Sequence, residues 1–287
     1  MPKVRNIKRK GRPLLIGAAA AAGLCLFCTW QNNDIVTTRI DYRSERLPAA
    51  FDGYTVVHIS DLHNKRFGKG QGRLLEQIEK AGPDIIFVTG DLIDARHTDL
   101  DAAMELISGA AKLAPVYYVS GNHEARSGVY PELKERLTLS GATVLDNDAV
   151  KIGENGAYFN VIGLSDPAFF PPRSGKKTMQ ETLGSLHTDS DALFNILLSH
   201  RPELFELYAG SGVDLVFSGH AHGGQVRLPF LGGLVAPGQG FFPEYTSGTY
   251  EKGGTTMVLS RGLGNSIIPV RVFNRPEIVV VTLYSRV

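Results

Sequence analysis

Short apolar runs and amphipathic segments follow one another between residues 54 and 139. The apolar runs are rich in β-branched and aromatic residues and predict strands at 54–60, 85–89 and 116–120. Apolar residues spaced three or four apart predict helices at 70–81, 100–113 and 130–139. This order of strand and helix is typical of a parallel sheet covered by helices. The first half therefore predicts an α/β fold, in which ligands bind beyond the carboxyl ends of the strands.

The second half of the chain is richer in predicted strands. They lie at 157–163, 193–199, 213–218, 255–260 and 278–283. Two sheets packed face to face, with helices outside, accommodate both halves. Residues 166–190 are expected to form a solvated loop, with a lid over the site as the alternative. The apolar residues of 229–242 are expected to pack beneath the site, with contact to a membrane as the alternative.

The N-terminus has a different pattern. Residues 1–13 are basic, and residues 14–30 form an uncharged run that spans roughly 26 Å as a helix, near the lower limit for crossing a bilayer. No small-residue cleavage site follows the run, which favours a transmembrane signal-anchor helix over a cleaved signal peptide. Residues 31–50 are expected to be a polar linker, and residues 51–287 a single domain. Positive-inside logic places that domain on the outer face, with a cytosolic domain whose tail lies on the membrane as the alternative.

Composition narrows the function further. The 287 residues are 43% hydrophobic and carry a net charge of +1, which suits a globular protein and offers no basic footprint for nucleic acid. Both cysteines, Cys25 and Cys28, lie within the N-terminal apolar run. The domain that follows therefore has no disulfide and no thiolate ligand.

Potential metal ligands follow the predicted strands in both halves. They are Asp61, His63, Asp91, Asn122, His200, His220 and His222. Carboxylate, amide and imidazole groups without thiolate suit Mn, Fe, Zn or Ni. Seven ligands exceed what one metal needs, so we expect two divalent metals that share one carboxylate. Taken singly, each of these residues could equally be a turn or helix cap, and the prediction depends on the whole set.

The order of these residues resembles the calcineurin-like metallophosphoesterase family. The matching stretches are Asp61-Leu62-His63, Gly90-Asp91-Leu92-Ile93-Asp94, Gly121-Asn122-His123-Glu124, His200 and Gly219-His220-Ala221-His222. Residues 50–285 are also similar to the bacterial membrane-associated branch of YkuE/YaeI-type phosphodiesterases. The resemblance implies a four-layer α/β/β/α sandwich behind the N-terminal helix. It also implies a single-pass protein of the bacterial cytoplasmic membrane.

The resemblance implies a role for each position as well. One metal would be held by Asp61, His63 and His222, the other by Asn122, His200 and His220, and Asp91 would bridge the two. His123 would be the catalytic residue that faces the substrate and protonates the leaving alkoxide. Asp94 would orient a ligand histidine, with a helix cap as the alternative.

Together these features predict a dimetal-dependent phosphoester hydrolase, a phosphodiesterase or pyrophosphatase that uses a metal-bridging hydroxide. Manganese is the expected metal.

A phospholipid or a nucleotide-glycolipid such as UDP-2,3-diacylglucosamine would suit a membrane-anchored enzyme, but that glycolipid is reached from the cytosolic side, against the predicted topology. A nucleotide or cell-wall phosphodiesterase, or a phosphomonoesterase, is the enzymatic alternative, and a non-catalytic metal-binding scaffold is the alternative of another class. No obligate protein partner is expected. Arg201, Arg227 and Arg261 are the candidate substrate contacts, with structural salt bridges as their alternative role.

Overall fold

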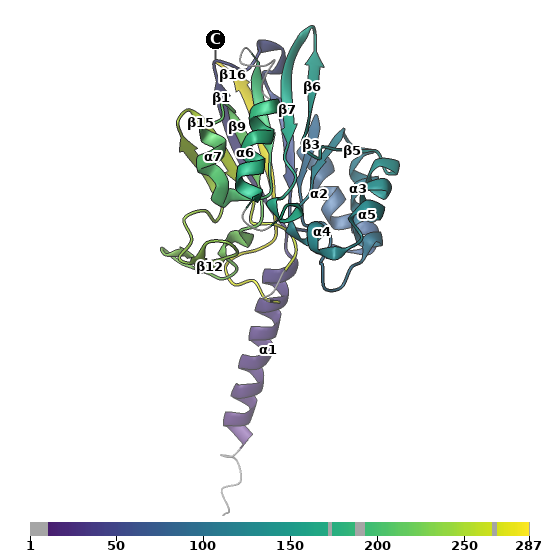
Figure 1. The fold of residues 1–287 in the computed structure, drawn as a ribbon. Coiled ribbons are helices and arrows are strands. Elements are labelled where there is room, and N and C mark those ends of the chain that lie inside the picture. The colour runs from purple at the N-terminus through teal and green to yellow at the C-terminus, as the bar shows by residue number, and fades with distance from the viewer. Residues whose placement is uncertain (1–10, 172–173, 187–192, 266–268, 287) are drawn as a thin grey trace, which may run out of the picture.

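Two six-stranded sheets form the centre of the molecule, and a long N-terminal helix leaves it at one end (Figure 1). The computed structural model describes residues 11–171, 174–186, 193–265 and 269–286. In spatial order, the first sheet consists of β1 (Val36–Ser44), β16 (Glu277–Ser285), β2 (Tyr54–Ile59), β3 (Ile85–Thr89), β4 (Val116–Val119) and β5 (Ala142–Val144). The second consists of β14 (Gly248–Lys252), β15 (Thr255–Leu259), β9 (Leu215–Ser218), β8 (Phe194–Leu198), β7 (Ala157–Gly163) and β6 (Asp148–Glu154).

Helices cover the outer faces of both sheets. They are α2 (Gly72–Ala81), α3 (Leu100–Ala110), α4 (Asn122–Ser127), α5 (Tyr130–Leu139), α6 (Gly175–Leu186) and α7 (Phe205–Ala209), and α1 (Gly11–Asn33) stands apart. Two small hairpins, β10 (Arg227–Leu228) with β11 (Gly232–Gly233) and β12 (Val235–Ala236) with β13 (Gly240–Phe241), lie beside the end of α1 (Figure 1). Short 3₁₀ turns occupy Ala49–Phe51, Lys69–Gln71, Pro167–Phe169, Pro202–Leu204 and His222–Gly224.

Three apolar layers hold these elements together. The middle layer joins the two sheets through residues such as Val56, Phe87 and Phe217. The outer layers join α2, α3 and α5 to the first sheet, and α6 and α7 to the second. Strands β3 and β8 are buried along their whole length, which explains their unbroken apolar sequence. The predicted four-layer α/β/β/α sandwich is therefore confirmed.

Parallel pairing places the strand ends that carry the candidate ligands together. Strands β2, β3 and β4 are mutually parallel, as are β7, β8, β9 and β15. Parallel strands present their carboxyl ends at one edge of a sheet, where ligands bind in such folds. The loops after β2, β3, β4, β8 and β9 consequently meet between the two sheets.

The expectation of a linker at residues 31–50 is wrong. Residues 36–44 form β1, which pairs in parallel with β16, and α1 extends to Asn33. Ile40 and Tyr42 face the core, and the Tyr42 ring lies 5.9 Å from that of Phe194. Charged residues alternate with these apolar ones because β1 is an edge strand whose other face is exposed.

Two further expectations differ from the structure. Within the segment expected to be a solvated loop, residues 175–186 form α6, which buries Met179 and Leu183 against the second sheet. Residues 172–173 and 187–192 lie outside the described part of the chain. In the segment expected to pack beneath the site, Phe230 in the turn between β10 and β11 and Phe241 on β13 are exposed instead. Pro229 and Gly232 flank the turn that carries Phe230.

Candidate metal centre

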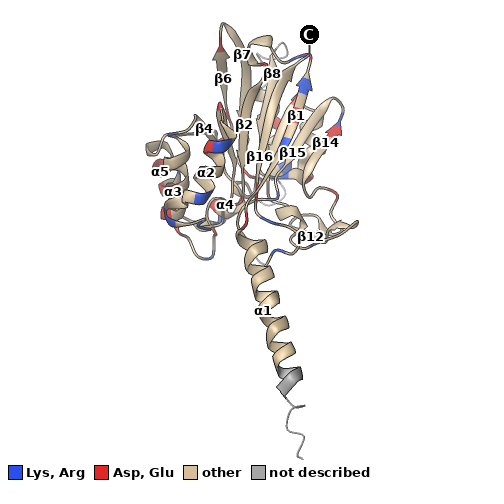
Figure 2. Cartoon of the chain, turned by 180° about the vertical axis from the view of Figure 1, so that it is seen from behind, with Lys and Arg blue, Asp and Glu red and all other residues tan. Residues whose placement is uncertain are grey.

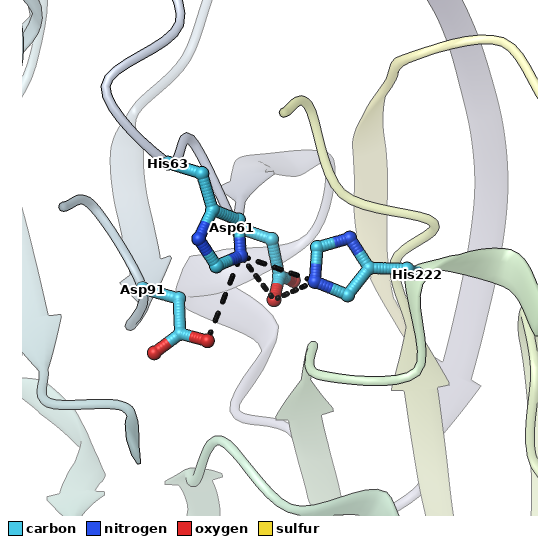
Figure 3. Close-up of side chains that lie close together, drawn as sticks. All are labelled: Asp61, His63, Asp91 and His222. Atoms are coloured by element: carbon cyan, nitrogen blue, oxygen red, sulfur yellow. Dashed lines mark hydrogen bonds and ion pairs between the residues drawn. The ribbon is translucent and has the colours of Figure 1, made fainter. Parts of the chain in front are cut away.

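Asp61, His63, Asp91 and His222 form one buried cluster, in which one ligand atom from each lies within 4.8 Å of the others (Figure 3). Nε2 of His63 lies 3.1 Å from Nε2 of His222 and 3.6 Å from Oδ2 of Asp91. Nε2 of His222 lies 3.3 Å from Oδ1 of Asp61. Two imidazole nitrogens that face each other and two carboxylates can all be satisfied by one cation, so these side chains fit a metal ion.

A second buried cluster consists of Asp91, His200 and His220. Nε2 of His200 lies 3.2 Å from Oδ2 of Asp91 and 3.1 Å from Nδ1 of His220. The adjoining Asn122 side chain is buried, and its Oδ1 accepts no hydrogen bond from the described residues. A buried acceptor without a donor is rare and fits a bound cation.

Asp91 belongs to both clusters through a single oxygen. Its Oδ2 faces His63 and His200, whereas its Oδ1 accepts a hydrogen bond of 2.8 Å from the backbone N–H of His123. The carboxylate is thereby held with one oxygen directed between the clusters. This is the arrangement needed to share one carboxylate between two cations.

Burial keeps most of the imidazoles neutral and available as ligands. It lowers the pKa of His63 to about 4 and of His222 to about 3, and it lowers the pKa of His220 well below its usual range. Burial also lowers the pKa of His200, but the adjacent Asp91 carboxylate outweighs it and raises that pKa to about 10. Nδ1–H of His200 donates to the carbonyl of Thr89 at 2.7 Å, which directs Nε2 toward the cluster.

The backbone at these residues is strained. Asp61, His63, Asp91, His220 and His222 all have φ between 45° and 67°. Non-glycine residues seldom adopt this left-handed conformation, and it concentrates at functional sites. Neighbouring glycines give the loops room: a Cβ on Gly219 would lie 2.5 Å from Oδ2 of Asp61. Five of the seven candidate ligands therefore lie on backbone that only close packing of these loops can hold.

Comparison with known proteins agrees with this geometry. Residues 54–224 match the calcineurin-like phosphoesterase profile. The chain belongs to that family. The uncharacterized metallophosphoesterase YkuE of Bacillus subtilis (strain 168) is 32% identical over 95% of this chain and 94% of its own length. Phosphodiesterase YaeI of Escherichia coli (strain K12) is 27% identical over 80% of this chain and 82% of its own. Among solved structures, a dimetal phosphatase from Danio rerio covers 74% of this chain and 88% of its own, with 15% identity and a TM-score of 0.49.

Family membership identifies the protein as a phosphoester hydrolase. A dinuclear divalent metal site is expected for calcineurin-like phosphoesterases, and the structure contains clustered His and Asp side chains that could hold one. Its carboxylates and histidines come from loops of both sheets.

His123 lies at the edge of this site, with its side chain 13% exposed. The backbone N–H of Ala95 donates to His123 Nδ1 at 3.0 Å. In the neutral ring this bond leaves the proton on Nε2. Oδ2 of Asp94 lies 3.6 Å from Nδ1 of His123 and 3.8 Å from Nδ1 of His63. Asp94 is thus between the two histidines without a hydrogen bond to either, and its carboxylate accepts from the backbone N–H of Arg96.

The three candidate substrate arginines lie in different places. A small cleft of about 130 Å³ opens at the site, and Arg201 is one of its lining residues. Arg201 also forms a bidentate ion pair with Asp166 at 2.6 and 3.0 Å. Neither Arg227 nor Arg261 lines the cleft. Arg261 pairs with Glu277 at 2.6 Å, and Arg227 donates to the carbonyl of Gly223 at 2.9 Å.

Two residues of the site, Glu124 and Arg126, have no role assigned to them in the sequence analysis. Glu124 is buried and accepts backbone N–H bonds from Gly121, Asp91, Leu92 and Ile93, at 2.7 to 3.3 Å. It therefore ties the loop after β3 to the start of α4. Arg126 lines the cleft and makes no ion pair with the described residues, so its guanidinium is free to bind an anion. The only signal for either in the sequence is its place within the three residues that follow His123.

Proposed function

We propose that the protein hydrolyses phosphodiesters or pyrophosphates with two divalent cations, of which manganese is the expected one. Asp61, His63 and His222 would hold one cation, Asn122, His200 and His220 the other, and Asp91 would bridge them. The observation that carries this proposal is the position of Asp91 Oδ2, which faces a histidine of each cluster at 3.6 and 3.2 Å. Two cations so held would supply a water of lowered pKa as nucleophile and would offset the negative charge of the phosphate.

The remaining side chains of the cleft suit the other requirements of the reaction. His123, with its proton on Nε2, would donate that proton to the leaving oxygen. Arg126, whose guanidinium pairs with none of the residues that the structure describes, would bind a phosphate oxygen. Arg201 would add positive charge while Asp166 fixes its orientation.

We further propose that α1 anchors the enzyme as a single-pass protein of the bacterial cytoplasmic membrane. Residues Leu15–Asn33 are long and apolar enough to span a bilayer by length and composition, and a signal sequence passes the same test. The basic residues before α1 favour a catalytic domain on the outer face. A lipid-linked phosphoester would be the substrate, with a nucleotide or cell-wall phosphodiester as the alternative.

Metal content and hydrolysis test the reaction together. The purified full-length chain should hydrolyse bis-p-nitrophenyl phosphate with added Mn²⁺, and EDTA should abolish that activity. Asp91→Asn should lose at least one of the two metals by elemental analysis, with roughly a 10²-fold or greater fall in rate, because an amide cannot bridge two cations as a carboxylate does. Asp148→Asn, on the exposed face of β6, is the matched control.

Two outcomes would contradict the proposal. Full metal content in Asp91→Asn would exclude Asp91 as the bridge. Two bound metals without hydrolysis of diesters, monoesters or nucleotide-lipid pyrophosphates would instead indicate a metal-binding scaffold.

A further inference from the structure

Five large apolar side chains are exposed at one end of the domain. Phe230, Leu231, Phe241, Phe242 and Phe273 have exposed fractions of 107%, 67%, 81%, 71% and 54%. We call these five residues the apolar surface. Single exposed apolar residues are ordinary, but a group of aromatic rings in solvent marks an interaction site. What covers this surface can be inferred from its neighbours.

The three segments that carry the apolar surface form one unit. Val226 pairs with Val272, and the backbone N–H of Arg227 donates to the carbonyl of Val272 at 3.0 Å. Phe230 and Phe273 line a shared hollow of about 450 Å³. On the other side, the backbone N–H of Phe242 donates to the carbonyl of Leu234 at 2.9 Å, which joins the second hairpin to the end of the first.

The apolar surface is continuous with α1. The Phe273 ring lies edge-on to Phe27 of α1, with centroids 5.7 Å apart. Phe27 lies within Leu15–Asn33, the stretch of α1 that is able to span a membrane. Over this stretch α1 carries no acidic or basic residue, and Leu24 and Leu26 are exposed (Figure 2). A medium that surrounds α1 at Phe27 would therefore also contact the Phe273 ring.

The end of α1 is fixed to the domain by side-chain contacts. The position of the apolar surface relative to α1 is therefore set by the fold. Gln31 is buried, and its Oε1 accepts a hydrogen bond from the backbone N–H of Asn274 at 3.2 Å. The Arg275 guanidinium lies 5.0 Å from the centre of the Trp30 ring and pairs with Asp34. Aromatic rings with an adjacent cation are typical of side chains at a membrane–water boundary.

The same hairpin that carries Phe241 also borders the cleft. Pro237 and Gly238, between β12 and β13, line the cleft beside His222. Phe241 and Phe242 lie at the other end of that hairpin. The entrance of the site and the apolar surface are thus parts of one short structural unit.

We propose that the apolar surface inserts into the interfacial region of the lipid bilayer in which α1 would be anchored. The domain then lies against the membrane instead of standing free on a stalk, and the cleft opens at the level of the lipid head groups. A bilayer is favoured over a second copy of the chain because α1 exposes apolar residues in direct continuity with Phe273. This proposal rests on the proposed anchoring of the chain by α1, and it holds whatever reaction the site performs.

The chain contains one tryptophan, Trp30, which allows a fluorescence test on the full-length protein. In a Trp30→Phe background, single variants Phe230→Trp and Phe241→Trp are reconstituted into phosphatidylcholine–phosphatidylglycerol vesicles with or without brominated acyl chains. Tyr158→Trp, near the far end of the β6–β7 hairpin, is the matched exposed control (Figure 1). Wild-type Trp30 reports the position of α1 itself, and melting temperatures show that each variant is folded.

The expected result is blue-shifted emission and at least a twofold loss of intensity in brominated vesicles for the tryptophans at 230 and 241, with neither effect at 158. Red-shifted, unquenched emission at 230 and 241 would overturn the proposal, because it would place the apolar surface in water. Blue-shifted emission without quenching by bromine would overturn it too, since it would indicate contact with protein instead of lipid.

Discussion

His123 is held in place by two separate hydrogen bonds, one to its backbone and one to its ring. Its backbone N–H binds Asp91 Oδ1 at 2.8 Å, while Nδ1 accepts from Ala95 at 3.0 Å. Removing the imidazole therefore leaves the bond to Asp91 in place. We expect His123→Ala to keep both metals and to lose about 10²- to 10⁴-fold in kcat, the usual contribution of a general acid.

Elemental analysis and steady-state kinetics on bis-p-nitrophenyl phosphate would check this expectation. His97→Ala, an exposed histidine three residues beyond Asp94, is the control and should retain wild-type turnover. A His123→Ala protein with two metals and unchanged turnover would remove His123 from the reaction.

The candidate ligands could be found in the sequence because each follows an apolar run that forms a strand. Asp61 follows β2, Asp91 follows β3, and His220 follows β9. Glu124 could not be found this way, since its function depends on accepting N–H groups from a loop more than 30 residues earlier, as in its 2.8 Å bond to Asp91 N. A single sequence carries no record of that contact.

Elements were predictable where burial is uniform or periodic. Strand β3, strand β7 and helix α5 have the predicted bounds, because each is either a continuous apolar run or an amphipathic repeat. Strand β1 was missed because its partner β16 lies more than 200 residues away and its outer residues are charged. Helix α6 was missed because glycines and polar residues dilute its apolar face.

The end of α1 supports the metal site through Asn274. Gln31 accepts the Asn274 backbone N–H, and Asn274 Nδ2 donates to the carbonyls of His222 at 2.7 Å and Gln225 at 2.9 Å. We expect Gln31→Ala to lower the free energy of unfolding by about 1–3 kcal/mol, because it leaves a buried N–H without an acceptor. The melting temperature should fall by roughly 2–8 °C, and affinity for Mn²⁺ should weaken.

Differential scanning calorimetry and metal titration of the full-length variant would measure both effects. Asn33→Ala is the control, since among the described residues the Asn33 side chain donates only to the carbonyl of Thr29, within the same helix. Equal melting temperatures and equal Mn²⁺ affinities for the two variants would show that α1 is a tether without influence on the site.

At the scale of the whole molecule, the two sheets enclose His58, which belongs to none of the candidate metal clusters among the described residues. His58 projects from β2 toward the second sheet, where its ring lies 5.2 Å from that of Phe217. Its Nε2 is 2.8 Å from Oγ1 of Thr89. The middle layer of the sandwich therefore contains an ionisable group with one neutral polar partner.

Burial lowers the pKa of His58 to about 3, from about 6.5 in the unfolded chain. Between these values the unfolded chain binds a proton that the folded chain does not, so the free energy of unfolding falls as the pH falls. We expect His58 to contribute a slope of up to about 1.4 kcal/mol per pH unit from pH 6.5 downward, levelling off near pH 3.

Urea unfolding of wild type and His58→Gln in EDTA would isolate this slope, because the other buried histidines are common to both proteins. The glutamine variant should be the less stable at pH 7, through poorer packing beside Phe217, and the difference should shrink or reverse on acidification. A difference that is constant between pH 7 and pH 4 would mean that His58 is not buried as a neutral ring between the sheets.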